Sequence, residues 1–355
     1  MTPPHPASGR PMTRPLAVLP SWARPVVAPA VLVVVLLAAS PLLSSYWVLA
    51  LTAVTIYSVV ALGLGLLVGR VGLVSLGQIA VLALGAWVAA RLTFATSLPF
   101  EVILLITGMI TMVLGTLVGL PALRLSGLYL ALITLMLAGA ITVVLTNTNF
   151  PNGGPGFLGH QELFTGDPPV RRPDIAITDE AYFRYAVVVA ALMFALVWWH
   201  VRSRPGRAWA AIRQSEPAAL AAGVNITTYK LWAWALASFV TGVAGGLLAG
   251  SVSKLYTYQF PTIDSILLLA VVLMGGIYSL WGAVVAGALM KLLPALLKYW
   301  GAPADLLLIL FGVGVLQVLL TAPGGLAQQF PRDMARLGRL LVGLTRRRAP
   351  GGEAP

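Results

Sequence analysis

Long apolar stretches recur along almost the whole chain, and they constrain its fold more than any other feature. A helix that crosses a membrane needs about 20 consecutive, mostly apolar residues. Ten stretches meet or nearly meet that length: 26–43, 46–69, 71–90, 101–123, 128–146, 185–201, 231–251, 263–280, 281–300 and 304–321. Only 10% of the 355 residues are charged and 59% are hydrophobic, which excludes both a soluble enzyme and an intrinsically disordered chain. We therefore expect an all-α, polytopic membrane protein with about ten transmembrane helices.

Two of these stretches begin unusually. Residues 71–78 contain two Gly, one Ser and one Gln, which is a poor composition for a lipid-facing turn. Irregular backbone is tolerated at membrane depth only where protein covers it, so we predict a broken or re-entrant start that is buried in the protein. The stretch 26–43 follows several arginines and could be a signal peptide. Because nine more spans follow it, an uncleaved first helix is the favoured interpretation.

The charged residues predict the orientation of the chain. If the N-terminus lies inside and ten spans alternate, 16 of the 23 Lys and Arg residues fall on the cytoplasmic side and 8 of the 11 acidic residues fall outside. This assigns residues 1–25 and 322–355 to cytoplasmic tails and 26–321 to a transmembrane domain. The net charge of +12 is then mainly a consequence of topology, and it gives no reason to expect nucleic-acid binding.

Two loops are long enough to have a role of their own. Residues 147–184 are predicted to face outside, either as a solvated connector or as part of the substrate entrance. Residues 202–230 are predicted to face the cytoplasm and to form two short helices, about 206–214 and 216–222, with Ser215 as the N-cap of the second and Gly223 as its stop. The small residues of this loop offer a surface that another protein could grip, although an interfacial loop without a partner is the alternative.

The tail after residue 322 has a pattern that suits the membrane surface. Arg332, Arg336 and Arg339 recur at helical spacing, with apolar residues on another face. We expect this segment to lie on anionic lipid headgroups as an anchor.

The chain lacks the residue patterns of the common catalytic and energy-using sites. It has no GxxxxGK[ST] sequence for ATP phosphates, no Cys, and only three widely spaced His residues. We therefore predict no catalytic residues, no metal site and no cofactor. The simplest function is a translocation subunit driven by a separate ATPase that grips residues 202–230.

Two other functions compete with this one. A stand-alone secondary carrier usually needs ionisable groups near the midplane, whereas Glu101, Asp264 and Asp305 fall at predicted outer ends of the spans. A membrane-embedded enzyme acting on lipid would need a polar catalytic cluster, which the sequence does not supply.

Small residues inside the spans predict close helix packing. Gly242, Gly246 and Gly250 are spaced by four and share one helical face. A short internal similarity is also present, because Gly72-x-x-Ser75-Leu76 recurs as Gly276-x-x-Ser279-Leu280. Such a match could reflect a structural repeat of the kind found in transporters, or it could arise by chance in a chain rich in these residues.

Four blocks of sequence that cover most of residues 55–327 resemble a known family. They are Gly65 to Gln78 with Leu84-Gly85-Ala86; Leu123 to Leu135 running on to Gly153-Gly154-Pro155; Gly206-Arg207-Ala208 through Ala211-Ile212-Arg213, Glu216, Ala219, Gly223-Val224-Asn225 and Tyr229-Lys230; and Gly275-Gly276, Ser279-Leu280-Trp281-Gly282 and Ala322-Pro323-Gly324-Gly325-Leu326. In this order they resemble the permease subunits of branched-chain amino acid ABC importers, of the LivM type.

The resemblance implies a multi-subunit importer in the cell (inner) membrane. Its expected partners are a second, homologous permease subunit, two cytoplasmic ABC ATPase subunits and an extracytoplasmic substrate-binding protein. It also implies that the third block couples the permease to the ATPase through Gly206, Arg207, Ala211, Arg213, Glu216 and Gly223. The chain departs from the family pattern at Gln214, where an acidic residue is frequent, and in having Pro217 directly after Glu216.

The substrate follows from the resemblance only as a class. Similar permeases carry leucine, isoleucine and valine, and close relatives carry urea or short amides. We expect Ser75, Gln78 and Thr134 to line the translocation path, with hydrogen bonds between helices as the alternative role.

Overall fold

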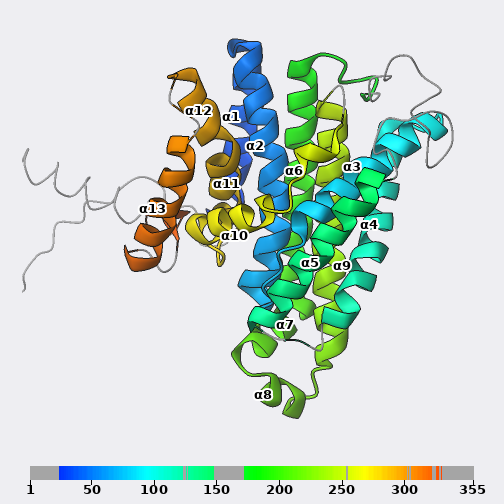
Figure 1. Cartoon of the computed structure of the whole chain (residues 1–355), viewed down its shortest axis with the longest axis vertical. Helices are drawn as coiled ribbons and strands as arrows, with labels where there is room; N and C mark the ends of the chain where they lie inside the picture. The colour runs from blue at the N-terminus through cyan, green and yellow to red at the C-terminus, as the bar shows by residue number, and fades with distance from the viewer. Residues whose placement is uncertain are drawn as a thin grey trace, which may run out of the picture.

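The computed structural model describes residues 24–122, 125, 127–147, 172–252, 255–301, 303, 305–321, 325–327 and 329, and its regular structure over these residues is helical (Figure 1). The helices are α1 Arg24–Ala39, η1 Ser40–Leu42, α2 Ser45–Gly65, η2 Leu66–Val71, α3 Gln78–Ala95, α4 Phe100–Ala122, α5 Gly127–Asn147, α6 Asp179–Arg202, α7 Arg204–Gln214, α8 Glu216–Ala221, α9 Ile226–Ser251, η4 Thr257–Gln259, α10 Asp264–Gly275, α11 Leu280–Gly287, η5 Ala288–Leu292, α12 Leu293–Tyr299 and α13 Asp305–Thr321. The predicted all-α membrane fold is confirmed.

The count of about ten spans is not confirmed. Among the described residues, seven helices are long and apolar enough to cross a membrane: Ser45–Val71, Gln78–Ala95, Phe100–Leu120, Gly127–Asn147, Asp179–Arg202, Ile226–Ser251 and Leu280–Tyr299. The other three predicted stretches contain shorter apolar helices, namely Pro29–Leu42, Asp264–Gly275 and Ile309–Val318. A 12-residue helix such as α10 is about 18 Å long, which is well short of the hydrocarbon thickness.

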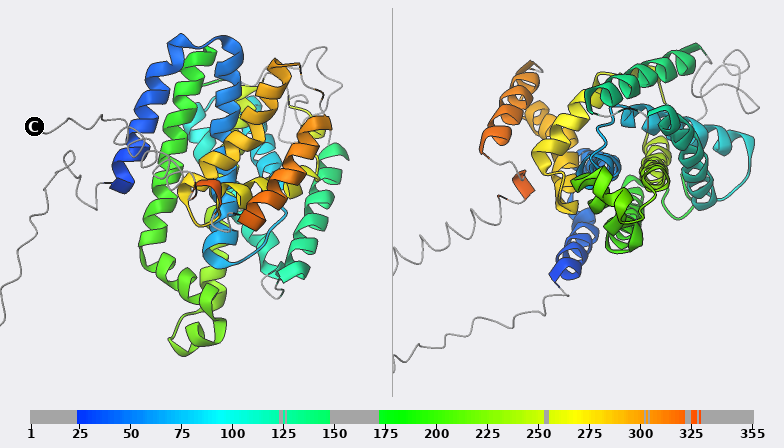
Figure 2. Two further views of the ribbon diagram at one scale, coloured as in Figure 1. Left: turned by 90° about the vertical axis from the view of Figure 1, so that its left-hand side faces the viewer. Right: turned by 90° about the horizontal axis from the view of Figure 1, so that it is seen from below.

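The helices α2 and α9 occupy the centre of the bundle. Seen from below in Figure 2, both are surrounded by other helices, whereas α13 and α5 lie at the periphery. The most apolar windows of α2 and α9 are 72% and 78% buried, but that of α5 is only 28% buried. The apolar residues of α5 and α13 that remain exposed are therefore available to lipid or to another subunit.

Glycines allow α9 to approach its neighbours closely. A side chain at Gly242 would overlap Thr111 of α4, and one at Gly250 would come within 2.5 Å of the Tyr182 hydroxyl of α6. A Cβ at Gly246 would lie 2.5 Å from Leu104. The three glycines thus mark where α9 packs against two other helices: Gly242 and Gly246 face α4, and Gly250 faces α6.

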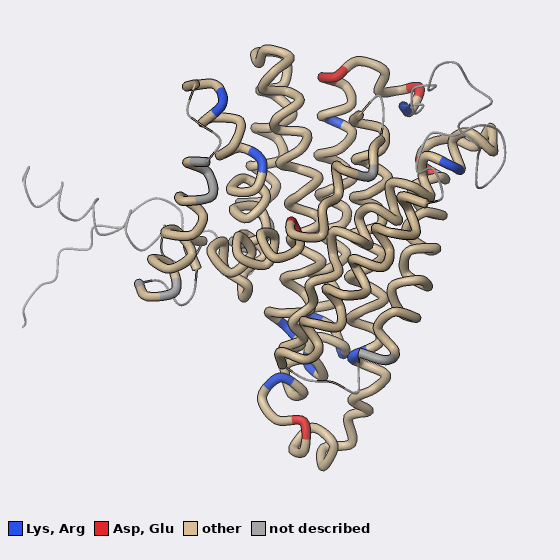
Figure 3. The backbone as a smooth tube through the Cα atoms, in the orientation of Figure 1, with Lys and Arg blue, Asp and Glu red and all other residues tan. Residues whose placement is uncertain are grey.

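Charged residues are distributed unevenly between the two ends of the bundle. In Figure 3 basic segments occur in both halves of the bundle, and those at the lower end gather where α2, α6, α7 and α9 meet. Apart from Glu216 in α8, the acidic segments lie in the middle or toward the opposite end. One acidic residue differs from expectation: Asp264 begins α10, which lies across the middle of the molecule rather than at an outer end (Figures 1 and 2).

Several predicted features lie outside the described residues. These are the N-terminal tail up to residue 23, residues 148–171 of the external loop, and Arg332, Arg336 and Arg339 of the tail that begins at residue 322.

Candidate functional site

The α7–α8 unit extends beyond the long helices at one end of the molecule (Figure 1). Its two helices have the predicted extent, because α7 ends at Gln214 and α8 begins at Glu216. The Ser215 hydroxyl accepts a hydrogen bond from the Ala218 amide at 3.4 Å, as expected for an N-cap. Gly223 ends the unit with a φ of +78°, a conformation that strongly favours glycine.

Two contacts hold this unit against α9. The indole Nε1 of Trp209, which is fully buried, donates to the Tyr229 carbonyl at 2.8 Å. The Lys230 ammonium lies 2.6 Å from the Glu216 carboxylate. Between α8 and the start of α9 is a recess of about 620 Å³, lined by Glu216, Leu220, Gly223, Val224, Asn225, Ile226, Thr227 and Lys230. The unit is thus a small, braced structure with a hollow at its exposed end.

The helical rod that begins with α2 is interrupted before α3. Its last turns, Leu66–Val71, widen into a π-helix, and Gly72 then adopts a φ of +85°. Residues 72–77 are not helical, and Ser75 and Leu76 within them are buried. The predicted broken start of this stretch is confirmed, and we call residues 72–77 the first break.

A second break, residues 276–279, separates α10 from α11 and shares two local features with the first, a glycine with positive φ and a serine that caps the backbone two residues on. Gly276 has a φ of +111°, the counterpart of Gly72. The Ser279 hydroxyl accepts from the Trp281 amide at 3.2 Å, and the Ser75 hydroxyl accepts from the Gly77 amide at 3.3 Å. The short sequence similarity between the two segments therefore corresponds to a local structural similarity.

The two breaks lie against each other. Gly69, in the last turn before the first break, packs so closely on Ile277 that a Cβ at Gly69 would overlap the Ile277 carbonyl. The Arg70 guanidinium donates to the Tyr278 carbonyl at 3.0 Å. Arg213 of α7 reaches the same place, because its Nη1 donates to the Gly69 carbonyl at 2.6 Å. Through Arg213, which also lies over the Tyr278 ring, the α7–α8 unit thus contacts the segments around both breaks.

Ser75, Gln78 and Thr134 come together at the first break. The Thr134 hydroxyl accepts from the Leu76 amide at 2.9 Å, and the Gln78 Oε1 accepts from the Thr241 hydroxyl at 2.8 Å. All three side chains are at most 2% exposed. In this conformation they secure the break from inside the subunit, and a role in lining the translocation path stays a prediction.

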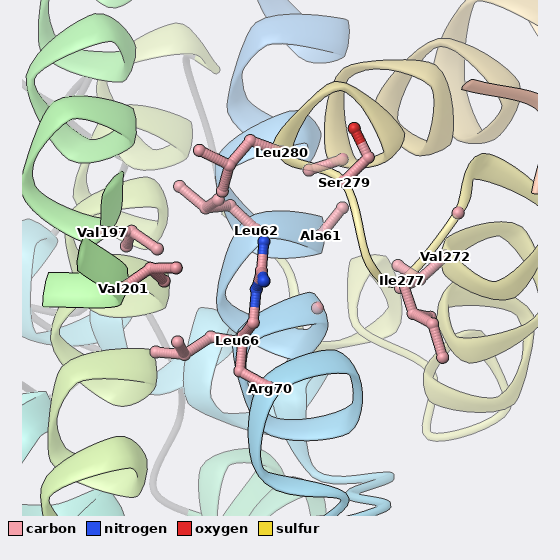
Figure 4. A pocket seen from close by; sticks show the side chains of 13 residues that line it. Ala61, Leu62, Leu66, Arg70, Val197, Val201, Val272, Ile277, Ser279 and Leu280 are labelled. Atoms are coloured by element: carbon pink, nitrogen blue, oxygen red, sulfur yellow. The ribbon is translucent and has the colours of Figure 1, made fainter. Parts of the chain in front are cut away.

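A small cavity lies above the contact between the breaks. Figure 4 shows it between α2, α6 and the second break, with the Arg70 side chain extending into the view from η2. It is lined by Ala61, Leu62, Gly65, Leu66, Arg70, Val197, Val201, Val272, Gly276, Ile277, Ser279, Leu280 and Ala283. Its volume of about 20 Å³ accommodates a water molecule but not an amino acid.

Sequence reasoning missed the partners of its own candidate residues. Arg70 donates to the Tyr278 carbonyl and Arg213 lies over the Tyr278 ring. Tyr278 lies inside the second copy of the repeated motif, so the repeat was the pattern that could have identified it. Thr241 was hidden in the apolar stretch of α9 and had no distinguishing pattern. Among the described residues, no group of three or more His, Asp or Glu side chains that could hold a metal ion occurs.

Comparisons with known proteins agree on one family. Residues 46–319 match the family described as branched-chain amino acid transport system, permease component. The high-affinity branched-chain amino acid transport system permease protein LivM of Salmonella typhimurium is 28% identical over 309 residues, covering 81% of this chain and 72% of the relative. LivM of Escherichia coli K12 is 28% identical over 302 residues, covering 79% and 70%.

A further match covers less of the chain. The fructose import permease protein FrcC of Rhizobium meliloti is 34% identical over 116 residues, which is 32% of this chain and 31% of that protein. No solved structure matches. Because the family match spans most of the described bundle, including both breaks and the α7–α8 unit, this chain belongs to the family of branched-chain amino acid transport permeases of the inner membrane.

Proposed function

We propose that the chain is the membrane-spanning subunit of an ABC importer that carries branched-chain amino acids into the cell, and that separate subunits hydrolyse the ATP. The single observation that carries this proposal is the α7–α8 unit, which stands clear of the long helices and is braced onto α9 by the Glu216–Lys230 pair. The ion pair and the buried Trp209 hold the unit in a defined position against α9, which supports its role as the surface that receives the ATPase.

The proposed complex follows from the family and from the shape of the bundle. Two ATPase subunits would bind at the α7–α8 end, which we place in the cytoplasm together with both chain termini. A second, homologous permease subunit would cover part of the exposed apolar surface, and a binding protein would deliver the substrate from outside. The cavity of about 20 Å³ is too small for an amino acid, so the path would form between two permease subunits or in another conformation.

The choice of substrate rests on the two LivM relatives, whose names specify branched-chain amino acids. In importers of this kind the binding protein selects the solute before the permease meets it. Urea or a short amide is the alternative substrate, and sugar is the substrate named for the shorter FrcC match.

The test is reconstitution with defined partners. The chain is co-expressed with candidate ATPases, a second permease and a binding protein from the same organism, and the purified complex is placed in proteoliposomes. We expect ATP-dependent uptake of radiolabelled leucine, isoleucine or valine, which leucine in excess suppresses and which urea, acetamide and fructose do not. Uptake of urea or acetamide instead would favour the alternative importer.

The same liposomes distinguish an importer subunit from a stand-alone carrier. We expect no uptake by the chain alone, and none by the complex with a non-hydrolysable ATP analogue. Accumulation of an amino acid by the chain alone, without ATP, would overturn the proposal.

A further inference from the structure

The contacts of Arg213 set it apart from the other basic residues of the α7–α8 unit. Its Nη1 donates to the Gly69 carbonyl at 2.6 Å, just before the first break. Its guanidinium carbon lies 4.4 Å from the centroid of the Tyr278 ring, in the second break. One planar cation thus engages a backbone oxygen of one interrupted helix and an aromatic face of the other, a combination that suits Arg and not Lys.

The aliphatic part of the same side chain also lies on the first break. A Cβ at Gly72 would be 3.7 Å from the Arg213 Cγ, so Arg213 passes over the residue whose positive φ creates the interruption. Gly69 and Ile277 are in backbone contact beneath it, and Arg70 donates to the Tyr278 carbonyl. Any displacement of the C-terminal end of α7 therefore acts on both breaks at once.

Broken helices are suited to respond to such a displacement. Residues at a break lack the continuous ladder of hydrogen bonds that makes a helix rigid, and π-helical turns such as η2 are frequent at functional sites. A hinge of this kind absorbs a change in φ and ψ while the helices on either side move as rigid bodies. What the hinge needs is a residue that connects it to the moving part.

We propose that Arg213 is a positioning residue of the transport cycle, which ties the C-terminal end of α7 to both helix breaks and so transmits motion of the α7–α8 unit to them. The inference rests on the proposed function, in which an ATPase moves that unit. It goes further by naming the intramolecular contact through which the motion enters the membrane domain. Arg213 need not touch the substrate or the ATPase for this role.

The test separates coupling from assembly. The complex is prepared with Arg213→Ala, Arg213→Lys, Tyr278→Ala and Tyr278→Phe, and solute uptake and ATP hydrolysis are measured in the same proteoliposomes. We expect Arg213→Ala and Tyr278→Ala to co-purify with the ATPase and to hydrolyse ATP, but to move about tenfold less solute per ATP, within the usual range of an allosteric coupling. Tyr278→Phe keeps the ring and should behave as the unaltered chain, and Arg213→Lys should be intermediate.

A matched control and a double variant make the result specific. Arg184 lies in the first turns of α6, at the opposite end of that helix from α7, and its Nε donates to the Glu180 carbonyl of the same helix at 3.4 Å. Arg184→Ala should therefore leave the ratio of solute to ATP unchanged. Because Arg213 and Tyr278 act together, the Arg213→Ala/Tyr278→Ala double variant should lose no more than about the larger single loss.

Three results would overturn the inference. They are an unchanged ratio of solute to ATP in Arg213→Ala, an equal loss in Arg184→Ala, or independent losses that multiply in the double variant. If Arg213→Ala fails to assemble, the comparison of Tyr278→Phe with Tyr278→Ala still decides whether the ring matters. Absence of ATP-driven uptake by the unaltered complex would instead refute the proposed function, so the two failures are distinguishable.

Discussion

The Glu216 carboxylate and the Lys230 ammonium, 2.6 Å apart, close the α7–α8 unit onto α9. The two partners differ in environment, because the Lys230 side chain is 8% exposed and that of Glu216 is 50% exposed. The carboxylate thus compensates an ammonium that is largely removed from water. Both residues also line the recess of about 620 Å³, so the pair shapes the surface that we propose meets the ATPase.

Removing the carboxylate should loosen the unit without unfolding the bundle. Glu216→Gln keeps the size of the side chain but leaves the buried ammonium without its counter-charge, which costs about 1–3 kcal/mol. We expect lower co-purification of the ATPase and faster proteolysis within residues 202–230, with the rest of the bundle unchanged. Glu216→Lys should have a larger effect, because it places two cations together.

The charge-swapped variant is the control for this pair. Glu216→Lys combined with Lys230→Glu restores opposite charges at the same spacing, so it should recover the resistance to proteolysis that Glu216→Lys loses. Recovery of proteolytic resistance without recovery of uptake would mean that the ATPase contacts the Glu216 carboxylate directly. No difference among these variants would show that the pair does not brace the unit.

Thr134 offers a test of what holds the first break. Its hydroxyl accepts the Leu76 amide at 2.9 Å in a buried position. Thr134→Val has nearly the same shape but leaves that amide unsatisfied, which costs about 1–3 kcal/mol, so the melting temperature of the purified complex should fall. Thr134→Ser retains the hydroxyl and should melt close to the unaltered complex.

The same pair of variants also tests the predicted path role. If Thr134 only secures the break, transport should fall in parallel with stability. A change in KM for the amino acid in Thr134→Ser, without a change in melting temperature, would assign the residue to the translocation path instead.

The sequence was sufficient for those parts of the fold that depend on local composition. Apolar length located the long helices, and the Ser215 cap and the Gly223 stop delimited α8, because capping and positive φ are properties of single residues. The irregular backbone of 72–77 could also be predicted, since its Gly, Ser and Gln residues suit neither lipid nor a regular helix. The same reasoning overestimated the length of α10, because the apolar residues of the sequence continue past Gly276, where the helix ends.

For the candidate site, the sequence predicted individual residues but not which residues they contact. Glu216 was expected to contact an ATPase, and nothing local indicated that Lys230, 14 positions later, would be its partner. Arg213 meets Gly69 across 144 positions of sequence. Contacts of this kind depend on how helices are arranged in space, and the periodicity of one helix carries no information about its neighbour.

The glycine stripe of α9 provides a prediction about packing. A Cβ at Gly242 would overlap the Thr111 side chain, so Gly242→Ala forces α4 away from α9. Overpacking of this kind costs about 1–3 kcal/mol, and we expect a lower melting temperature and lower yield in detergent. Gly139→Ala is the matched control, because a Cβ there meets nothing within 4 Å. It should be neutral or stabilising by up to about 1 kcal/mol, the difference in helix propensity between the two residues.

At the other end of the bundle, Arg172 fastens the described part of the external loop. Its Nε donates to the Gly250 carbonyl at 3.0 Å, and its Nη1 contacts Asp179 at 2.7 Å and the Ile177 carbonyl at 3.1 Å. A lysine cannot reproduce this fork of donors, so Arg172→Lys should increase protease cleavage between residues 172 and 178 in right-side-out vesicles. Arg184→Lys should not increase cleavage, because the Nε of Arg184 donates to the Glu180 carbonyl within α6. Equal cleavage of the two variants would show that the fork does not hold the loop, whereas faster cleavage of Arg172→Lys alone, from the outside only, would also establish that this end of the bundle faces away from the cytoplasm.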